Sequence, residues 1–405
     1  MNLLTRSEAG GWVYQSPSRG QGIDKGSKLF LSGEPLSYGS FRCKTPLEDA
    51  WVRLEADCET KGLLSPETAV TVMLSFFTVD GHPIRRQYIS PVNGDSLGSL
   101  HFCRVFEVPE NTAYGIVELS LRWPQGGHVV FNQPMLSECD PPPERTARVL
   151  VTHFHCNGSS IPWFDRITTL FGKIGPCKPD LVCLSELLHA HDRLANPREA
   201  AEPIDGPFIR LLSQLATKHN TYVIGNFLEA DGSGLFNTSA LIDRKGGLTG
   251  IYRKTHLPLS EIEFGTSPGE TYPVFETDFA CLGLITCWDA AFPEPMGILR
   301  QKGAELVVCS SLGDFWPQDM VRAHDNGLWL AVAGAHRQPN VPYPPSRIYN
   351  PVGTAIAACG DDNADVFVFS DIDFNRCFYK HWASVGPCEG EPPSLYRIER
   401  RPETY

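Results

Sequence analysis

Cys287 is the residue of this sequence whose surroundings best suit a nucleophile. It follows the apolar and β-branched run Gly283–Thr286, which predicts a buried strand. Trp288 and Asp289 come next, and the Phe292–Pro293 pair ends any strand. A thiol at the end of a buried strand, where the chain turns, faces a cleft while its backbone is held rigid. This position suits covalent catalysis by the thiol.

Two charged residues occupy similar positions upstream. Lys254 follows the second strand of a predicted hairpin, whose turn is Asp243–Gly247. Glu186 ends the apolar run Leu181–Leu184, where desolvation would raise its pKa and suit it to proton transfer. Taken singly, such charged residues lie more often on the surface. Because sites gather at strand ends in α/β sheets, the order of the three predicts one shared site.

Several further segments resemble the nitrilase superfamily, the carbon–nitrogen hydrolases that use a Glu-Lys-Cys triad. The resemblance covers residues 147–380. The segments that carry it, besides the three above, are Val223–Asn226, Asn237–Ala240, Ser267–Gly269, Pro273–Thr277, Gly303–Val308, Arg322–Gly327 and Asn350–Gly353. The combination is specific, although each segment alone is a weak signal.

The resemblance implies a mechanism for the three residues. Glu186 would take the thiol proton, and Lys254 with the backbone N–H of Trp288 would stabilise the oxyanion. The family also carries a second glutamate shortly after the lysine. Glu261 and Glu263 both fit that position, and the spacing to Gly265 favours Glu263, with Glu261 kept as a substrate or oxyanion contact.

The expected substrate is a small linear amide. In the resembling family an aromatic residue and Asp after the cysteine, here Trp288–Asp289, are typical of members that cleave amides or carbamoyl groups. An N-carbamoyl amidohydrolase or a nitrilase is the alternative, and a non-catalytic scaffold is the alternative from another class. His189 and His191 are expected in a loop over the site, and Trp316 is expected to touch the substrate.

No metal or cofactor is expected. His153 and His155 share one face of a strand, but no third ligand is suitably spaced, so a hydrogen-bonded structural role is favoured. The thirteen cysteines include no Cys-x-x-Cys pair, which argues against a disulfide framework or a zinc ribbon.

Composition favours a cytoplasmic enzyme. The formal charge of −12 argues against a nucleic-acid partner. No apolar run approaches the ~18 residues of a membrane span, and the N-terminus lacks the apolar core of a signal peptide. The expected partners are the small-molecule substrate and further copies of the chain, as a homodimer or larger homo-oligomer.

The elements that must position these residues follow an α/β pattern from residue 147 onward. A strand is expected at Ala147–Thr152, and helices at Trp163–Ile174 and Gly206–His219. The family resemblance refines this expectation to a four-layer α-β-β-α sandwich formed by residues 147–405.

The first 140 residues have a different pattern. Short alternating or apolar runs are separated by turn-forming stretches, which predicts an antiparallel β-sandwich of residues 1–140. The runs are Trp51–Ala56, Val70–Val79, Phe102–Val108, Tyr114–Trp123 and Val129–Leu136. The last of them are similar to galactose-binding-like jelly rolls. Residues 141–146 continue a proline-rich linker, so residues 1–140 are expected to fold on their own.

Overall fold

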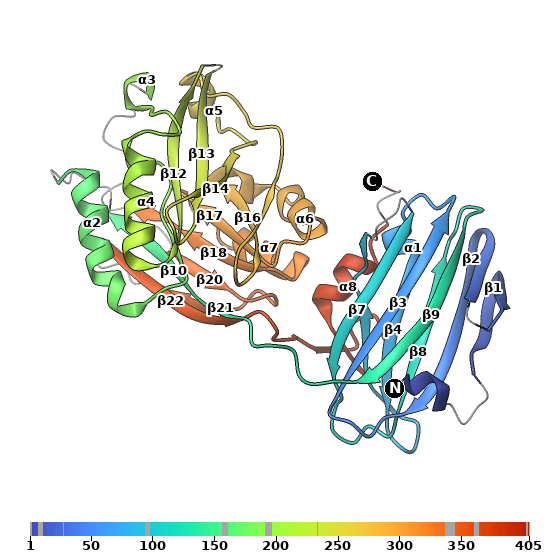
Figure 1. Ribbon diagram of the computed structural model, residues 1–405. Helices are drawn as coiled ribbons and strands as arrows, with labels where there is room; N and C mark the ends of the chain where they lie inside the picture. Colours follow the sequence, from blue (N-terminus) through green and yellow to red (C-terminus); the bar gives the residue numbers. More distant parts are fainter. Residues whose placement is uncertain are drawn as a thin grey trace. The chain divides into compact units, whose positions relative to one another are not determined.

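The structure is a computed structural model that describes residues 2–6, 11–26, 28–93, 98–155, 161–190, 197–232, 234–313, 315–336, 345–359, 364–401 and 404. The chain divides into two compact units. Unit 1 comprises Met1–Pro143 and Cys377–Tyr405, and unit 2 comprises Glu144–Arg376. Figure 1 shows both as ribbons.

Unit 1 consists mainly of antiparallel strands that belong to one hydrogen-bonded sheet. Its path runs β23-β24-β5-β4-β8-β2-β9-β3-β7-β6, and β1 pairs with β2. The elements are η1 (Leu3–Arg6), β1 (Val13–Asp24), β2 (Lys28–Pro46), β3 (Trp51–Lys61), α1 (Pro66–Ala69), β4 (Val70–Phe77), β5 (Pro83–Ile89), β6 (Val92–Asn93), β7 (Ser99–Glu107), β8 (Tyr114–Arg122), β9 (His128–Glu138), β23 (Lys380–His381), β24 (Glu389–Gly390) and α8 (Pro392–Ile398).

Buried and more exposed residues alternate along the strands of unit 1, and the buried ones form its core. On β3, Val52, Leu54, Ala56 and Cys58 are buried while the residues between them are more exposed. The five strand runs expected from the sequence coincide with β3, β4, β7, β8 and β9. The long β1–β2 ribbon was not expected, because its many Gly, Ser and Pro residues conceal its period.

The C-terminal segment returns to unit 1. Strand β24 pairs in parallel with β5, and the half-buried Arg104 of β7 donates to the two carboxylate oxygens of Glu391 at 2.6 and 3.0 Å. This differs from the predicted division, which assigned everything from 147 to 405 to the second domain. Unit 2 is instead inserted into unit 1, and local sequence patterns do not reveal such long-range pairing.

Unit 2 contains two sheets. The first has the order β14-β13-β12-β11-β10-β19, with β22 added beside β10, and the second has the order β15-β16-β17-β18-β20-β21. The elements are β10 (Thr146–His155), α2 (Trp163–Ile174), η2 (Gly175–Cys177), β11 (Leu181–Cys183), α3 (Pro197–Ala200), α4 (Pro207–His219), β12 (Tyr222–Asp231), β13 (Gly234–Ile242), β14 (Leu248–Arg253), α5 (Leu259–Glu263), β15 (Val274–Glu276), β16 (Cys281–Thr286), η4 (Cys287–Ala291), α6 (Glu294–Gln301), β17 (Leu306–Ser310), α7 (Gln318–Asn326), β18 (Trp329–Ala333), β19 (Ala335–His336), β20 (Arg347–Tyr349), β21 (Ala355–Ala358) and β22 (Val366–Asp373).

Each sheet of unit 2 has its own helices. Helices α2 and α4 lie side by side and pack with β10–β13 in one apolar cluster, as Figure 1 also shows, while α6 and α7 pack with β16–β18 in another. Small polar residues connect the two sheets: Ser310 Oγ donates to the Leu184 carbonyl at 2.8 Å, and Ser239 and Thr286 hydroxyls lie 3.1 Å apart. The helices expected at 163–174 and 206–219 are confirmed.

Parallel pairing places several strand ends at one edge. Strands β10, β11 and β12 are mutually parallel in the first sheet, and β16, β17 and β18 are parallel in the second. The residues that follow these strands in the two sheets, Glu186 after β11 and Cys287 after β16, line the same pocket. Among the described residues, no helix has the length and apolar character needed to cross a membrane.

Candidate active site

Cys287 begins the turn that follows β16. Its φ of 47° is left-handed, a conformation that costs a non-glycine residue about 1–3 kcal/mol and persists where surrounding contacts enforce it. Here a capping box provides those contacts: the Thr286 side chain accepts from the Asp289 N–H, and Asp289 Oδ2 accepts from the Thr286 N–H at 2.9 Å. The thiol is thus presented from a fixed backbone.

Asp289 extends this support to the hairpin that precedes Lys254. It is fully buried, and its Oδ2 also accepts from the Tyr252 hydroxyl at 2.6 Å. Its Oδ1 accepts from the His256 N–H at 3.0 Å and the Thr255 hydroxyl at 3.1 Å. One buried carboxylate therefore connects the cysteine turn to both sides of Lys254.

Glu186 lies beyond the end of β11 and is buried. Its Oε1 accepts from Asn237 Nδ2 at 2.8 Å and Lys254 Nζ at 3.0 Å, and its Oε2 accepts from the Leu312 N–H at 2.9 Å. Three donors from different elements orient the carboxylate. In addition to the effect of burial, the charge of this carboxylate raises the pKa of the Cys287 thiol.

Lys254 follows β14 directly and its side chain is fully buried between two carboxylates. Its Nζ lies 3.0 Å from Glu186 Oε1 and 2.5 Å from Glu261 Oε1. Although burial opposes the charge, the carboxylates of Glu186 and Glu261 raise the pKa of Lys254 above its usual range. The lysine is therefore a permanent cation within the site.

Glu261, not Glu263, is the second glutamate in contact with the lysine. Besides Lys254, Glu261 accepts from Asn237 Nδ2 at 3.2 Å, whereas Glu263 is exposed. The preference for Glu263 is thus wrong, because residues two apart on the short helix α5 project about 200° from one another. Burial and the charge of Glu186 raise the pKa of Glu261, while Lys254 opposes that rise.

The resting cysteine is a thiol rather than a thiolate. Burial and the charge of Glu186 raise the pKa of Cys287 to about 12, against the opposing effect of Lys254. A reaction near neutral pH therefore needs the thiol proton to leave as the new bond forms. The Glu186 carboxylate, which lines the same pocket as Cys287, is the acceptor at hand.

A pocket of 430 Å³ opens onto Cys287, Glu186 and Glu261. Much of its wall is apolar, with contributions from several segments of unit 2. The apolar wall residues include Leu187, Pro197, Leu228, Phe264, Trp288 and Phe315. This volume fits a small molecule.

Two residues that the sequence reasoning did not identify complete the site. Asn237 of β13 joins the two glutamates, and Asn226 of β12 donates to Asn237 Oδ1 at 2.8 Å while accepting from the Leu187 N–H at 2.9 Å. Both are buried asparagines within otherwise apolar strands, and that feature of the sequence could have revealed them.

The structure does not bring every expected residue to the pocket. His189 is buried among aromatic rings, with ring centroids 5.2 Å from Phe208 and 6.1 Å from Phe227, and is not part of the pocket wall. Trp316 is 57% exposed, because its neighbour Phe315 takes the inward position. Trp288 does line the pocket. His191 lies outside the described residues.

Other polar groups in unit 2 have structural contacts. His153 is buried and its Nδ1 lies 3.0 Å from the Ser346 hydroxyl, consistent with the structural role expected for it. Within the described part of the chain, no group of three or more His, Cys, Asp or Glu side chains is arranged to hold a metal ion.

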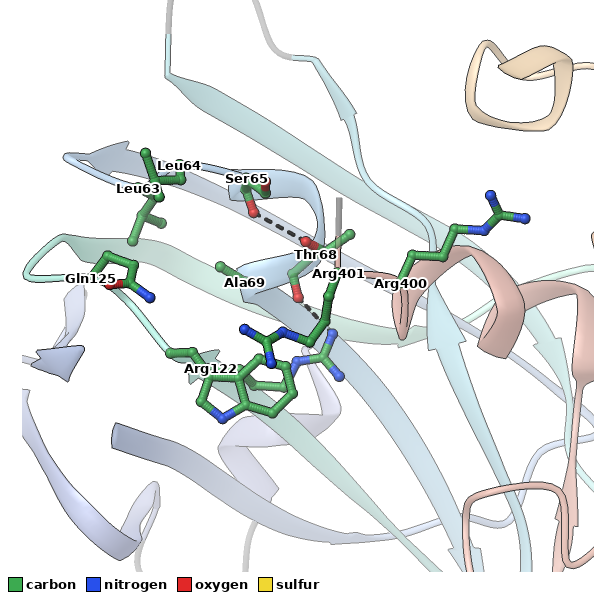
Figure 2. A pocket seen from close by; sticks show the side chains of 10 residues that line it. Leu63, Leu64, Ser65, Thr68, Ala69, Arg122, Gln125, Arg400 and Arg401 are labelled. Atoms are coloured by element: carbon green, nitrogen blue, oxygen red, sulfur yellow. Dashed lines mark hydrogen bonds between the residues drawn. The ribbon is translucent and has the colours of Figure 1, made fainter. Parts of the chain in front are cut away.

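A second pocket, in unit 1, has a different character. Figure 2 shows arginine side chains around the short helix α1. Its cavity volume of 20 Å³ holds about one water molecule. Arg122 donates to the carbonyls of Thr68 at 2.5 Å and Ile398 at 2.7 Å, and so connects α1 with α8. These contacts serve the packing of unit 1.

Comparisons with known proteins identify the family of the chain. The model of the family described as carbon-nitrogen hydrolase matches residues 163–378. The human omega-amidase is 32% identical over 197 residues, which cover 44% of this chain and 71% of that protein. The citrullinase of Francisella tularensis is 29% identical over 236 residues, covering 51% and 77%. A mutant of the Nesterenkonia AN1 amidase, from the nitrilase superfamily, shares the fold with a TM-score of 0.51 at 19% identity, covering 65% and 97%.

Proposed function

Because the chain belongs to the carbon–nitrogen hydrolase family and is an amidase-like hydrolase, we propose that it cleaves small linear amides through a thioester on Cys287. The observation that carries this proposal is that Glu186 and Cys287 line one pocket while the buried Lys254 contacts Glu186. Glu186 accepts a hydrogen bond from Lys254 Nζ at 3.0 Å, and, together with burial, its charge raises the pKa of the Cys287 thiol.

In the first half-reaction, the Cys287 sulfur attacks the amide carbonyl carbon while its proton passes to Glu186. The carbonyl π electrons become an oxyanion, which the Lys254 ammonium and the Trp288 N–H stabilise. Glu186 then gives the proton to the departing nitrogen as the C–N bond breaks. Ammonia or an amine leaves, and the acyl group remains on sulfur.

In the second half-reaction, Glu186 takes a proton from a water molecule that attacks the thioester carbonyl. The C–S bond breaks, the thiol regains the proton, and a carboxylic acid leaves. Glu261 keeps Lys254 in place throughout, through the 2.5 Å contact, and Asn237 holds both glutamates. In this scheme Glu261 and Asn237 are positioning residues.

The proposal extends to the layers of unit 2 and to the fold of unit 1. Unit 2 would be a four-layer α-β-β-α sandwich, and unit 1 a jelly-roll-like β-sandwich that is accessory to the chemistry. The twelve cysteines that the structure describes are free thiols, which favours a reducing compartment such as the cytoplasm. Assembly into a homodimer or larger homo-oligomer stays part of the proposal.

The nucleophile assignment is tested by substitution and mass spectrometry. Cys287→Ala should abolish ammonia release from amides, whereas Cys103→Ala, at an exposed cysteine of unit 1, should retain it. With a slowly hydrolysed amide, intact-mass measurement of the wild-type protein should show an acyl adduct on Cys287. An adduct located on any other cysteine would overturn the assignment.

Carbamoyl hydrolysis is the second candidate function. It is favoured by the similarity to the citrullinase, over 51% of this chain. Ammonia release from a panel of amides, ureido compounds and matching nitriles separates the candidates. The Trp288–Asp289 pair leads us to expect that amides are turned over faster than their nitriles.

A further inference from the structure

Two residues at the reacting groups have a left-handed backbone. Leu187, directly after Glu186, has a φ of 49°, and Cys287 has a φ of 47°. Residues other than glycine keep this conformation only where neighbouring contacts enforce it. For Cys287 those contacts come from the capping box, and for Leu187 the contact is the 2.9 Å hydrogen bond from its N–H to Asn226 Oδ1. The positions of the carboxylate and the thiol therefore depend on the side chains that hold these two turns.

Asn226 also reaches the Cys287 turn, through a row of hydrogen bonds. Asn226 of β12 and Ser239 of β13 are directly paired across the first sheet, so their side chains lie on one face. Asn226 Nδ2 donates to Ser239 Oγ at 3.0 Å, and the Ser239 hydroxyl lies 3.1 Å from the Thr286 hydroxyl of the second sheet. The Thr286 side chain in turn accepts from the Asp289 N–H. The row thus joins the turn after β11 to the turn after β16.

The orientation of each amide in this network is determined by its partners. A backbone N–H can only donate, so Asn226 must present its oxygen to Leu187. Its Nδ2 then donates to Asn237 Oδ1 at 2.8 Å as well as to Ser239. The Nδ2 of Asn237 consequently faces the carboxylate of Glu186, to which it donates at 2.8 Å. Asn226 therefore supports both reacting groups, one through each branch of its hydrogen bonds.

The row is buried, which keeps it in one arrangement. Asn226 and Thr286 are 0% exposed, and Ser239 is 1% exposed. Hydrogen bonds in such surroundings are stronger than in water, and a group that loses its partner there cannot turn to solvent instead. We propose that Asn226 and Ser239 are positioning residues: they connect the two left-handed turns across the sheets and so fix the distance between the carboxylate and the thiol. The inference rests on the proposed function, because it adds two residues to the support of the same site.

A matched pair of substitutions on β13 tests the link. Ser239→Ala removes a hydroxyl of the row, whereas Thr238→Val removes the hydroxyl of the preceding residue, which is buried on the opposite face and donates to Glu229 at 2.7 Å. Neither residue belongs to the described wall of the pocket, so the KM for the fastest amide of the panel should stay within about twofold in both variants.

The two variants should differ in kcat. Ser239→Ala should lower kcat by ~10-fold, because small displacements of reacting groups slow the reaction, and Thr238→Val should leave kcat within about twofold. Both lose a buried hydroxyl, so a fall in thermal stability alone would not separate them. Equal kcat values in the two variants would overturn the inference.

Non-additivity gives a second test, with Thr286 as the partner. Thr286→Val removes the other hydroxyl of the link, and Thr286→Ser keeps it. In the Thr286→Val background the link is already broken, so adding Ser239→Ala should lower kcat by less than about twofold, against ~10-fold in the wild type. Thr286→Ser should retain kcat within about threefold, because the hydroxyl is preserved. Losses of kcat that simply multiply in the double variant would contradict a shared link.

Alkylation separates the inference from the proposed function, because iodoacetamide labels the thiol without any C–N cleavage. Burial and the charge of Glu186 raise the pKa of Cys287, and a loosened link should weaken both effects. In Ser239→Ala, Cys287 should therefore be labelled at least ~3-fold faster at pH 8 than in the wild type or in Thr238→Val. An unchanged labelling rate would overturn the inference while leaving hydrolysis intact. If the wild-type protein hydrolysed no amide and the difference in labelling were present, the link would stand and the proposed function would be wrong.

Discussion

At the scale of single residues, Lys254 has two tasks that a substitution removes together. Lys254→Met should lower kcat by ~10²-fold or more, because the oxyanion loses its ammonium. It should also lower the free energy of unfolding by about 3–5 kcal/mol, because Glu186 and Glu261 remain buried without their cation. Ammonia release and urea denaturation measure the two effects.

Lys245→Met is the matched control for this substitution. Lys245 is exposed in the turn between β13 and β14. Its loss should therefore change the free energy of unfolding by no more than about 0.5 kcal/mol, and the activation free energy that sets kcat by no more than the same amount. If Lys254→Met retained kcat within a few-fold, the lysine would be structural and the proposed oxyanion site would be wrong.

The raised pKa of Cys287 gives a pH dependence with a definite sign. Only the thiolate is alkylated, and the pKa of the Cys287 thiol is about 12. The rate of iodoacetamide labelling should therefore rise roughly tenfold per pH unit from pH 8 to pH 11. An unperturbed thiol, with a pKa near 8.5, levels off in the same range. Labelling of Cys287 that levels off near pH 9 would contradict the raised pKa.

Glu186→Gln changes labelling and turnover in opposite directions. It removes the negative charge that raises the pKa of Cys287, so the labelling profile should move to lower pH and alkylation at pH 8 should become faster. Hydrolysis should nevertheless fall by at least ~10²-fold, because the proton acceptor is lost. Parallel losses in both assays would instead indicate a distorted site.

The residue scale also shows where sequence reasoning ends. Glu186, Lys254 and Cys287 could be brought together from the sequence because each follows an apolar strand. The choice between Glu261 and Glu263 depended on the direction of side chains on a helix of one turn, which spacing to Gly265 does not encode. His189 was misplaced for a similar reason, since a loop residue can turn either inward or toward the aromatic cluster.

At the scale of elements, helix α5 provides a matched pair of substitutions. Glu261→Gln should lower kcat by ~10-fold or more, because a neutral amide holds Lys254 less firmly than a carboxylate does. Glu263→Gln alters the exposed face of the same helix and should keep kcat within about twofold. Equal effects of the two variants on kcat would remove Glu261 from the positioning role.

The turn of η4 is held by a neighbouring strand, which yields a second test at this scale. Tyr252 of β14 is buried and donates to Asp289 at 2.6 Å, so Tyr252→Phe leaves that carboxylate short of a donor. We expect a loss of about 1.5–3 kcal/mol in unfolding free energy, the range for hydrogen bonds to charged groups. Thermal or urea denaturation measures it, and an unchanged midpoint would show that the turn holds without this strand.

Strands could be predicted from the sequence where burial of one face gives alternating apolar residues, or burial of both faces gives an unbroken apolar run. Strand β16 has an unbroken buried run and β3 alternates, and both patterns are readable from the sequence. The β1–β2 ribbon lacks such a signal because close approach requires glycine: a Cβ at Gly20 of β1 would lie 2.8 Å from the Tyr38 carbonyl oxygen of β2. Backbone proximity of this kind is decided by the partner strand, which local sequence does not identify.

At the scale of the whole chain, the two units do not simply follow one another, because unit 2 interrupts the sequence of unit 1. The family resemblance correctly located the α/β portion, and the break near residue 143 was visible as a proline-rich stretch. The return of Cys377–Tyr405 to unit 1 was not predictable, because short strands and one short helix carry little periodicity. Parallel pairing of β24 with β5 joins residues about 300 apart in sequence, beyond the reach of local patterns.

This return predicts that residues 1–143 do not form a stable domain alone. Without the C-terminal segment, the half-buried guanidinium of Arg104 keeps the Tyr88 carbonyl but loses both oxygens of Glu391 and the hydroxyl of Ser394. An uncompensated buried charge costs about 3–5 kcal/mol, a large part of the stability of a domain of this size. The fragment 1–143 should therefore aggregate or unfold without cooperativity, and co-expression with residues 377–405 should restore a cooperative thermal transition.

The same ion pair supplies the control for the fragment experiment. A 377–405 segment carrying Glu391→Ala should fail to restore the transition, because Arg104 stays unpaired. One carrying Glu399→Ala alters a different contact, the 2.7 Å hydrogen bond from the exposed Ser384 hydroxyl, and should restore the transition almost fully. If fragment 1–143 alone unfolded cooperatively at the temperature seen with the intact segment, unit 1 would be complete without its C-terminal strands. The chain would then be two successive domains, as its sequence first suggested, rather than one domain inserted into another.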